Sequence, residues 1–146
     1  MKALIQRVTG AEVTVGGAII SRTGRGILLL LGVEKGDTDK DLEYISRKIA
    51  NLRIFCDNEG KMNLSVKDIA GEVLVVSQVT LSADCRKGNR PSFDHAEGPE
   101  KANTMYRKAV ERLNNEGISV STGKFASSMQ VSLINDGPVT FLLDSR

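Results

Sequence analysis

The hydrophobic residues of this chain recur with two different periods. Alternating or continuous apolar runs that are rich in Val, Ile and Leu are typical of β-strands. Such runs cover residues 3–15, 18–20, 27–33, 53–56, 72–81, 119–125, 129–134 and 139–143. The Gly16-Gly17 pair predicts a two-residue hairpin turn, and Thr9-Gly10 predicts a bulge or bend in the first run. The unbroken run 27–33 indicates a strand that is covered on both faces.

Two other segments follow the period of an α-helix. Between residues 38 and 52 the apolar side chains recur at spacings of three and four, and Thr38 or Asp37 suits the N-cap. A second helix is predicted over 99–116, with Pro99 in its first turn and Gly117 at its end. The apolar stripe of this second helix consists of Ala102, Met105, Tyr106, Ala109, Val110 and Leu113.

The order of these elements predicts one α+β domain over residues 1–146. Neighbouring strands outnumber strand–helix alternations. This favours a strongly curved or barrel-like, mostly antiparallel β-sheet with the two main helices packed outside. The core must be aliphatic, because the chain has no Trp and only 4% aromatic residues. A chain of 146 residues can bury enough surface to fold without a metal or a disulfide.

Composition and charge narrow the classes of function. The 20 basic and 18 acidic residues give a net charge of +2, so any contact with RNA must come from a local basic cluster. The N-terminus does not resemble a signal peptide, and the longest apolar run is far shorter than a membrane span. Cys56 and Cys85 have no metal or redox spacing, which favours free thiols in a reducing compartment. We expect a soluble cytoplasmic protein with no membrane contact.

Polar side chains follow the buried run 73–76 abruptly. Ser77 and Thr80 bring hydroxyl groups, and Gln78 brings an amide that can donate and accept hydrogen bonds. A polar cluster at the end of a core strand can project binding groups from a rigid support. The alternative is a strand whose polar side chains merely face water.

A second polar segment is Asn135-Asp136-Gly137-Pro138-Val139-Thr140. In it, Gly137 tolerates positive φ, and Pro138 has a fixed φ and no N–H. One interpretation is a tight hairpin turn between two strands. The other is a preformed main-chain claw, in which a cis Gly137-Pro138 bond directs carbonyl oxygens. Few X-Pro bonds are cis, and the pattern leaves both interpretations open.

A polar loop over residues 82–98 carries the densest basic cluster of interest. Arg86, Lys87 and Arg90 lie within five residues of one another. Such a loop suits contacts with the phosphates of a nucleic acid. The alternative is a solvated basic loop without a ligand.

Several common types of active site are disfavoured because the residues or motifs that they need are absent. A Ser-His-Asp triad would have to use His95, the only histidine, and no Gly-x-Ser-x-Gly elbow is present. The chain also has no phosphate-binding loop, no dinucleotide fingerprint and no metal-ligand spacing. We therefore expect no cofactor and no metal.

At its two polar segments the chain resembles a known family. Ser77-Gln78-Val79-Thr80-Leu81 resembles the Ser-Gln-x-Thr-Leu signature of D-aminoacyl-tRNA deacylases, also called D-tyrosyl-tRNA deacylases. The segment 135–140 resembles their Asn-x-Gly-Pro-x-Thr signature. The similarity continues in order through residues 1–7 and 11–13, 57–63, and 87–93, and it covers essentially the whole chain.

The resemblance implies an enzyme of translation quality control. Such a proofreading hydrolase cleaves the ester bond between a D-amino acid, or glycine, and the 3′-terminal adenosine of tRNA. The family also implies a homodimer with its active sites at the subunit interface. The carbonyl oxygens of Gly137 and Pro138 from one subunit would face the α-carbon of the substrate bound to the other. An L side chain would clash there, whereas a D side chain points elsewhere.

Catalytic roles follow from the same resemblance. Ser77 and Gln78 would hold the ester and donate to the developing oxyanion. Thr80 has no evident base to activate it, so we expect it to support the site rather than act as a nucleophile. The 2′-hydroxyl of the terminal adenosine would position or activate the attacking water.

Three further residues are expected at the site by resemblance. Phe125 would stack on the terminal adenosine, although a purely structural role in the core is the alternative. Arg7 would brace the Gly-Pro turn, and Met129 would help to bind the substrate. The chain departs from the family pattern at Ser127-Ser128, where an alanine and an acidic residue are expected.

Two competing hypotheses make different predictions. A non-catalytic RNA-binding module of the same fold would use the basic loop without turnover. A serine hydrolase acting through Ser77 or Thr80 would need His95 as its base and would show a histidine-like pH profile.

Overall fold

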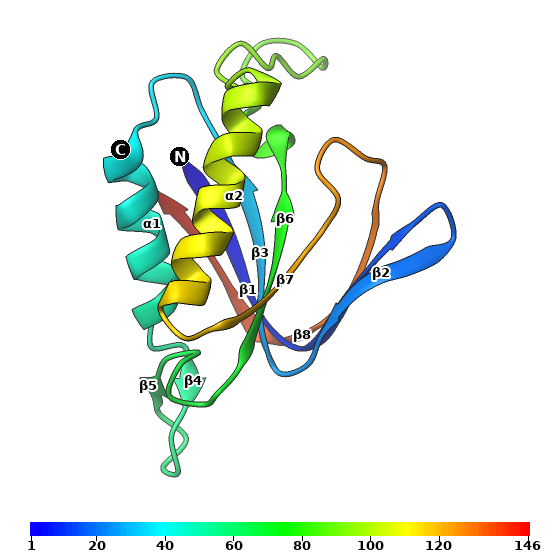
Figure 1. The fold of residues 1–146 in the computed structure, drawn as a ribbon. Helices are drawn as coiled ribbons and strands as arrows, with labels where there is room; N and C mark the ends of the chain where they lie inside the picture. Colours follow the sequence, from blue (N-terminus) through cyan, green and yellow to red (C-terminus); the bar gives the residue numbers. More distant parts are fainter.

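Strand β1 (Lys2–Val15) is the centre of the fold in the computed structural model, which describes residues 1–146 (Figure 1). Along one side, its first half pairs with β3 (Gly26–Gly32) and its second half with β2 (Ala18–Thr23). Along the other side, β8 (Gln130–Asp144) pairs with nearly its whole length. β1 therefore joins two parts of a sheet that turn toward one another.

The remaining elements follow in a simple order along the chain. They are α1 (Asp39–Asn51), β4 (Phe55–Cys56), β5 (Met62–Leu64), β6 (Glu72–Ser77), the 3-10 helix η1 (Val79–Ser82), α2 (Pro99–Asn115) and β7 (Ser119–Thr122). β6 pairs in parallel with β3 and with β7, whereas every pairing of β1 is antiparallel. β4 and β5 form a separate small hairpin.

The main sheet is nearly closed on itself. Its order is β2-β1-β3-β6-β7, and the two end strands approach each other where Ser121 Oγ donates to the carbonyl oxygen of Arg22 at 3.1 Å. The prediction of a strongly curved, barrel-like sheet is therefore confirmed. The pairing is mixed, since two of the five strand pairs in this sheet are parallel.

The two helices cover one face of the sheet, so the core has two parts. Between helices and sheet, side chains such as Leu42 and Leu113 pack on Ile5, Leu29 and Val75. Inside the curve of the sheet lies a smaller apolar cluster of Val8, Ala11, Val13, Leu28, Leu74 and Val76. β3 and β6 contribute to both parts, which confirms the prediction that the run 27–33 is covered on both faces.

Local signals in the sequence are matched closely by the helices and the first hairpin. Gly16 and Gly17 both have positive φ, at 58° and 82°, as the predicted two-residue turn requires. Thr38 is the N-cap of α1, and its N–H donates to Asp41 Oδ2 at 2.8 Å. The hydrogen bond from the Thr38 hydroxyl to the same carboxylate, together with this backbone bond, lowers the pKa of Asp41 to about 2.

Three strand predictions were wrong in detail. The predicted strand 119–125 ends at Thr122, so Phe125 lies in the loop after it. The predicted strand 72–81 ends at Ser77, because the chain turns into η1 directly after it. The predicted strands 129–134 and 139–143 are one continuous strand, β8, and no hairpin turn separates them. Residues 135–140 instead form an outward bulge, where five steps along β8 match two along β1.

Neither helix is long and apolar enough to cross a membrane. Cys56 and Cys85 are both exposed and unpaired, which confirms the prediction of two free thiols.

Candidate active site

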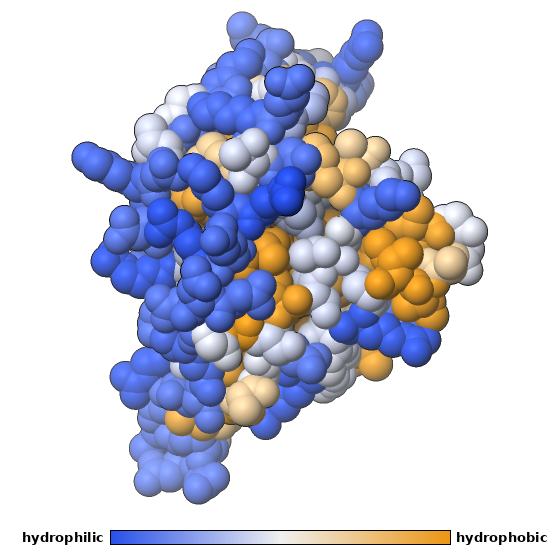
Figure 2. Space-filling model, in the orientation of Figure 1, coloured by the Kyte–Doolittle hydropathy of each residue, from blue (hydrophilic) through white to orange (hydrophobic).

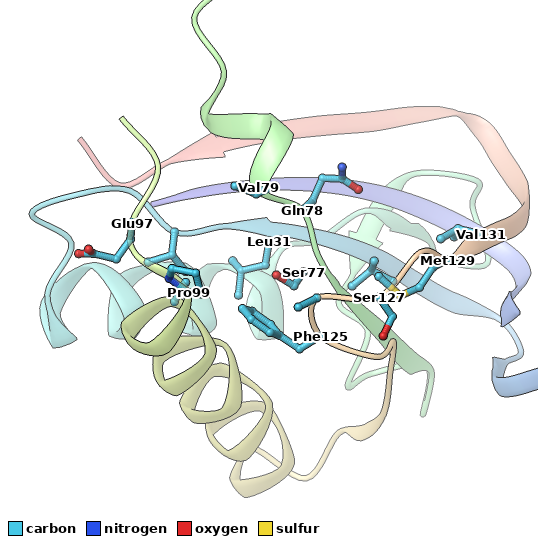
Figure 3. A pocket seen from close by; sticks show the side chains of 14 residues that line it. Leu31, Ser77, Gln78, Val79, Glu97, Pro99, Phe125, Ser127, Met129 and Val131 are labelled. Carbon is cyan, nitrogen blue, oxygen red and sulfur yellow. The ribbon is translucent and has the colours of Figure 1, made fainter. Parts of the chain in front are cut away.

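A pocket opens at the carboxyl end of β6, beside the start of α2 (Figure 3). Its volume is about 400 Å³, which is in the range of small-ligand sites. Nine of its 14 lining residues are hydrophobic. Apart from Ser77, Gln78 and Ser127, the one polar lining residue is Glu97. The pocket is therefore an apolar slot with a few polar groups.

Ser77 lies in this pocket because β6 ends there. The four preceding residues are buried, and Ser77 is the last residue to pair with β3, opposite Leu31. The N–H of Gln78 donates to the carbonyl oxygen of Leu31 at 2.8 Å, which fixes the backbone one residue further. The half-buried Ser77 side chain then faces Phe125 across the pocket (Figure 3).

Gln78 and Thr80 are linked to each other rather than to a base. Gln78 lines the pocket, and its Nε2 donates to Thr80 Oγ1. Thr80 is exposed and is not among the lining residues. Val79 and Thr80 open η1, and the first N–H groups of a helix have no partner inside it. The site thus offers main-chain donors next to the Ser77 hydroxyl.

Phe125 forms the wall of the pocket opposite Ser77, and the ring of Tyr106 packs against the ring of Phe125. The two ring centroids are 5.9 Å apart at an interplanar angle of 47°. The Tyr106 hydroxyl donates to the carbonyl oxygen of Val75 at 2.9 Å, one strand position from the pocket wall. Burial raises the pKa of Tyr106 to about 12. From the sequence, Tyr106 was predicted only as a member of the apolar stripe of the second helix. Its role in supporting Phe125 was not predicted.

Met129 closes the segment that carries Phe125. Its sulfur accepts a hydrogen bond from the N–H of Lys124 at 3.3 Å, and the side chain lines the pocket. Ser127, at the departure from the family pattern, lines it as well. Phe125, predicted to stack on the terminal adenosine, and Met129, predicted to help bind the substrate, therefore lie together with Ser77 and Gln78.

Gly137 and Pro138 do not lie in the pocket of their own chain. Both are exposed in the bulge of β8, and the peptide bond between them is cis. Ser77 pairs with Leu31 of β3, and Leu31 pairs with Ala3 of β1. The bulge instead lies opposite Arg7 of β1. Four residue steps of β1 separate Ala3 from Arg7, roughly 14 Å along the strand.

The bulge is held by two side chains. Arg7 is buried, and its Nε donates to the carbonyl oxygen of Asp136 at 2.8 Å while Nη1 donates to that of Ile54 at 2.6 Å. Asn135 Nδ2 donates to the carbonyl oxygens of Arg7 at 3.2 Å and Val139 at 3.0 Å. The predicted bracing contact of Arg7 is thus present within one chain. Asn135 was not singled out from the sequence, although it lies two residues before Gly137.

Only glycine fits at position 137 in this arrangement. A Cβ on Gly137 would collide with Asn135 Oδ1 and with the backbone nitrogen of Val139. The side chain that ties the bulge together therefore occupies the space that any other residue at 137 would need.

The basic loop splits into paired and unpaired cations. Arg86 forms a fork with Asp84, at 2.9 and 2.6 Å, and this holds the pKa of the Asp84 carboxyl well below its usual range. Lys87 and Arg90 are exposed and form no ion pair. Of the three residues predicted to contact phosphates, Lys87 and Arg90 are therefore the two whose charges are not already paired.

His95 and the pocket are separate features. His95 lines another surface depression together with Lys2 and Asp84, and its side chain makes no hydrogen bond. No group of three His, Cys, Asp or Glu side chains is arranged to hold a metal ion.

Comparisons with known proteins agree with these features. Residues 4–144 match the family described as D-Tyr-tRNA(Tyr) deacylase. A D-aminoacyl-tRNA deacylase of Thermodesulfovibrio yellowstonii is 57% identical over 146 residues, with 100% of both chains covered. That of Magnetococcus marinus is 59% identical over 145 residues, covering 99% of this chain and 96% of its own.

Two solved structures share the fold. One, described as c-Myc DNA Unwinding Element Binding Protein, is 48% identical with a TM-score of 0.94, over 100% of this chain and 99% of that one. Another, described as a probable eukaryotic D-amino acid tRNA deacylase, is 16% identical with a TM-score of 0.80 over 97% of both chains. The second likeness shows the fold alone.

Proposed function

This chain belongs to the D-Tyr-tRNA(Tyr) deacylase family, and on that premise we propose that it hydrolyses the ester bond between a D-amino acid and the 3′-terminal adenosine of tRNA. It is a hydrolase of the D-aminoacyl-tRNA deacylase type. The observation that carries the proposal is the apolar pocket with Ser77 and Gln78 at its polar end and Phe125 on the facing wall. A nucleoside fits such a slot, with its esterified ribose toward the polar groups.

The reaction is direct attack of water on the ester carbonyl. A bond forms between the carbonyl carbon and the water oxygen, and the bond from that carbon to the ribose oxygen breaks. A proton of the water passes to the ribose oxygen, which leaves as a hydroxyl group. The main-chain N–H groups of Val79 and Thr80 and the hydroxyl of Ser77 are the donors for the oxyanion. Thr80 receives the amide of Gln78, which suits a role in orienting that amide rather than attack on the ester. The 2′-hydroxyl of the substrate positions the water.

Rejection of L-aminoacyl-tRNA comes from a second copy of the chain. Gly137 and Pro138 are exposed and lie far from Ser77 of their own chain, so they can reach a pocket only in another subunit. Their carbonyl oxygens leave no room for an L side chain at the α-carbon of the substrate. Glycine, which has no side chain, passes this filter.

Exposed apolar surface supports the homodimer. β8 presents Ile134, Phe141 and Leu142 with exposed fractions of 68, 39 and 60%. Figure 2 shows further apolar surface over β2, where Ile19 and Ile20 are exposed. Exposed apolar residues that gather along one region mark interaction surfaces. The enzyme would thus act as a cytoplasmic, dimeric proofreading enzyme.

The experiment is hydrolysis of D-tyrosyl-tRNA and L-tyrosyl-tRNA at matched enzyme concentration. Loss of the D ester with the L ester intact is the expected result. Equal loss of both esters would contradict the filter assigned to Gly137 and Pro138. Loss of neither would contradict the enzymatic function.

A nucleic-acid-binding module without turnover is the second candidate. The structural relative at 48% identity carries a name that describes DNA binding, and the unpaired Lys87 and Arg90 suit phosphate. Binding of tRNA without hydrolysis of either ester would favour this candidate.

A further inference from the structure

The loop over residues 83–98 follows η1 and ends at the wall of the pocket. Gln78 and Val79 line the pocket at the start of η1, Glu97 lines it near the end of the loop, and Pro99 lines it directly after the loop. Figure 1 shows the loop projecting beyond the end of β6 and the start of α2. A nucleic acid whose 3′ end enters the pocket must therefore pass beside this loop.

The loop has a defined shape. Asp84 and Ser92 exchange two backbone hydrogen bonds, at 2.8 and 3.0 Å, which close its outer part. The N–H of Ala96 donates to the carbonyl oxygen of Phe93 at 2.9 Å, and the N–H of Glu97 donates to that of Val33 at 3.0 Å. Phe93 thus begins a turn that ends at Ala96, the residue directly before the pocket-lining Glu97.

Phe93 has the most exposed aromatic ring of the chain, at 45%. The other well-placed ring near the pocket, Phe125, is packed against the core. An exposed ring costs free energy in water unless a partner covers it. The flat face of a nucleobase is such a partner.

The charges around Phe93 favour a nucleic acid as that partner. In and around the loop, Lys101 is paired with Glu97, Lys2 with Glu34, and Arg86 with Asp84. Lys87 and Arg90, three to six residues from the exposed ring, have no acidic partner. Unpaired cations beside an exposed aromatic ring are the combination that binds single-stranded nucleic acids.

We propose that Phe93 is a stacking platform for a base of the single-stranded 3′ end of tRNA, with Lys87 and Arg90 on the adjoining phosphates. This inference rests on the proposed function, because it needs the terminal nucleoside in the pocket. The bases stacked here are those immediately 5′ of the esterified nucleoside. The platform holds the single strand outside the pocket while the ester is cleaved inside it.

The test compares two substrates that differ only in this single strand: D-tyrosyl-tRNA and the D-tyrosyl ester of adenosine. Phe93→Ala should raise KM for the tRNA ester about tenfold, as loss of one stacked base does, with kcat unchanged. The same variant should cleave the adenosine ester as the wild type does. Phe93→Trp, which keeps a flat ring, should restore KM for the tRNA ester.

Salt dependence tests the phosphate contacts separately. Each contact with a single strand contributes about 0.7 to the slope of log affinity against log salt, so Lys87→Gln with Arg90→Gln should lower that slope by about 1.4. Arg47→Gln is the matched control, because Arg47 is exposed and unpaired on α1. It should leave the slope unchanged.

Three outcomes would overturn the proposal or separate it from the proposed function. Equal effects of Phe93→Ala on both esters would mean that Phe93 acts through the pocket. No effect on either ester would mean that no base stacks there. If the wild type cleaves neither ester, the proposed function fails. Binding of uncharged tRNA then decides the platform, which stands if Phe93→Ala weakens that binding about tenfold and falls if it does not.

Discussion

The carbonyl oxygen of Arg7 accepts a hydrogen bond from Asn135, while the guanidinium of Arg7 donates to the next residue along β8, Asp136. One residue of β1 thus holds the bulge through its backbone and its side chain at once. Removing either partner affects the same short segment, the one that carries Gly137 and Pro138.

Asn135→Ala should loosen this segment. The carbonyl oxygens of Arg7 and Val139 would lose their donor, at a cost of about 1–3 kcal/mol of unfolding free energy. The ratio of kcat/KM for D- over L-tyrosyl-tRNA should fall, because the carbonyl groups of Gly137 and Pro138 lose their fixed direction. Asn135→Asp keeps the shape without the donor and should behave alike. An unchanged ratio in both variants would contradict this role.

Mixed dimers should reveal a site shared between subunits. Ser77→Ala damages the pocket, and Gly137→Val cannot keep the bulge, because even a Cβ collides with Asn135. Equal mixing of the two variants should recover D-selective cleavage at roughly a quarter of the sites, because half of the dimers carry one site in which the pocket and the Gly137-Pro138 segment are both intact. Unmixed variants are the controls, and an absence of recovery would argue for a site within one subunit.

Alkaline pH should destabilise the pocket wall through Tyr106. Burial raises its pKa to about 12, above the value of about 10 in the unfolded chain. The neutral hydroxyl therefore stabilises the fold below pH 10, and this contribution is lost as the pH rises from about 10 to 12. Urea titrations across that range should show the decline in the wild type. Tyr106→Phe, which cannot ionise, should show a smaller one.

His95→Ala should leave kcat/KM for D-tyrosyl-tRNA within about twofold of the wild type, because His95 faces a different depression from Ser77. The pH–rate profile should keep its shape. A loss of about a hundredfold or more would favour the serine-hydrolase hypothesis over attack by water.

Leu142→Glu should convert the proposed homodimer to monomers. The side chain is 60% exposed on β8, and a buried carboxylate without a partner would oppose association. Analytical ultracentrifugation measures the change, and the ratio of kcat/KM for D- over L-tyrosyl-tRNA should fall with it because Gly137 and Pro138 no longer reach a partner. Met62→Glu is the matched control, since Met62 is 47% exposed on β5. Equal sedimentation of both variants and the wild type would exclude β8 from the interface.

The sequence predicted those parts of the site that depend on local pattern. Ser77 and Gln78 could be located because the change from buried to polar residues coincides with the end of β6. The helices were also predicted to within two residues, since caps and spacing are local signals. The fold class followed from the order of elements, although the parallel pairing of β3 with β6 did not.

The roles of Asn135 and Tyr106 could not be predicted, because each depends on a contact between distant segments. Asn135 bonds a residue 128 positions away, and Tyr106 reaches from α2 to a strand 31 positions earlier. The bulge in β8 was missed for a related reason. Asn, Asp, Gly and Pro are typical of hairpin turns, and only the register with β1 shows that the strand continues through them.

The tilted packing of Phe125 against Tyr106 makes the pocket wall an extension of the main core. Whatever fills the pocket is therefore read out in the melting temperature of the whole domain. A ligand at a hundred times its Kd would add about 2.7 kcal/mol to the free energy of unfolding. Adenosine and its esters can consequently be ranked by thermal shift, without charged tRNA and before any catalytic assay.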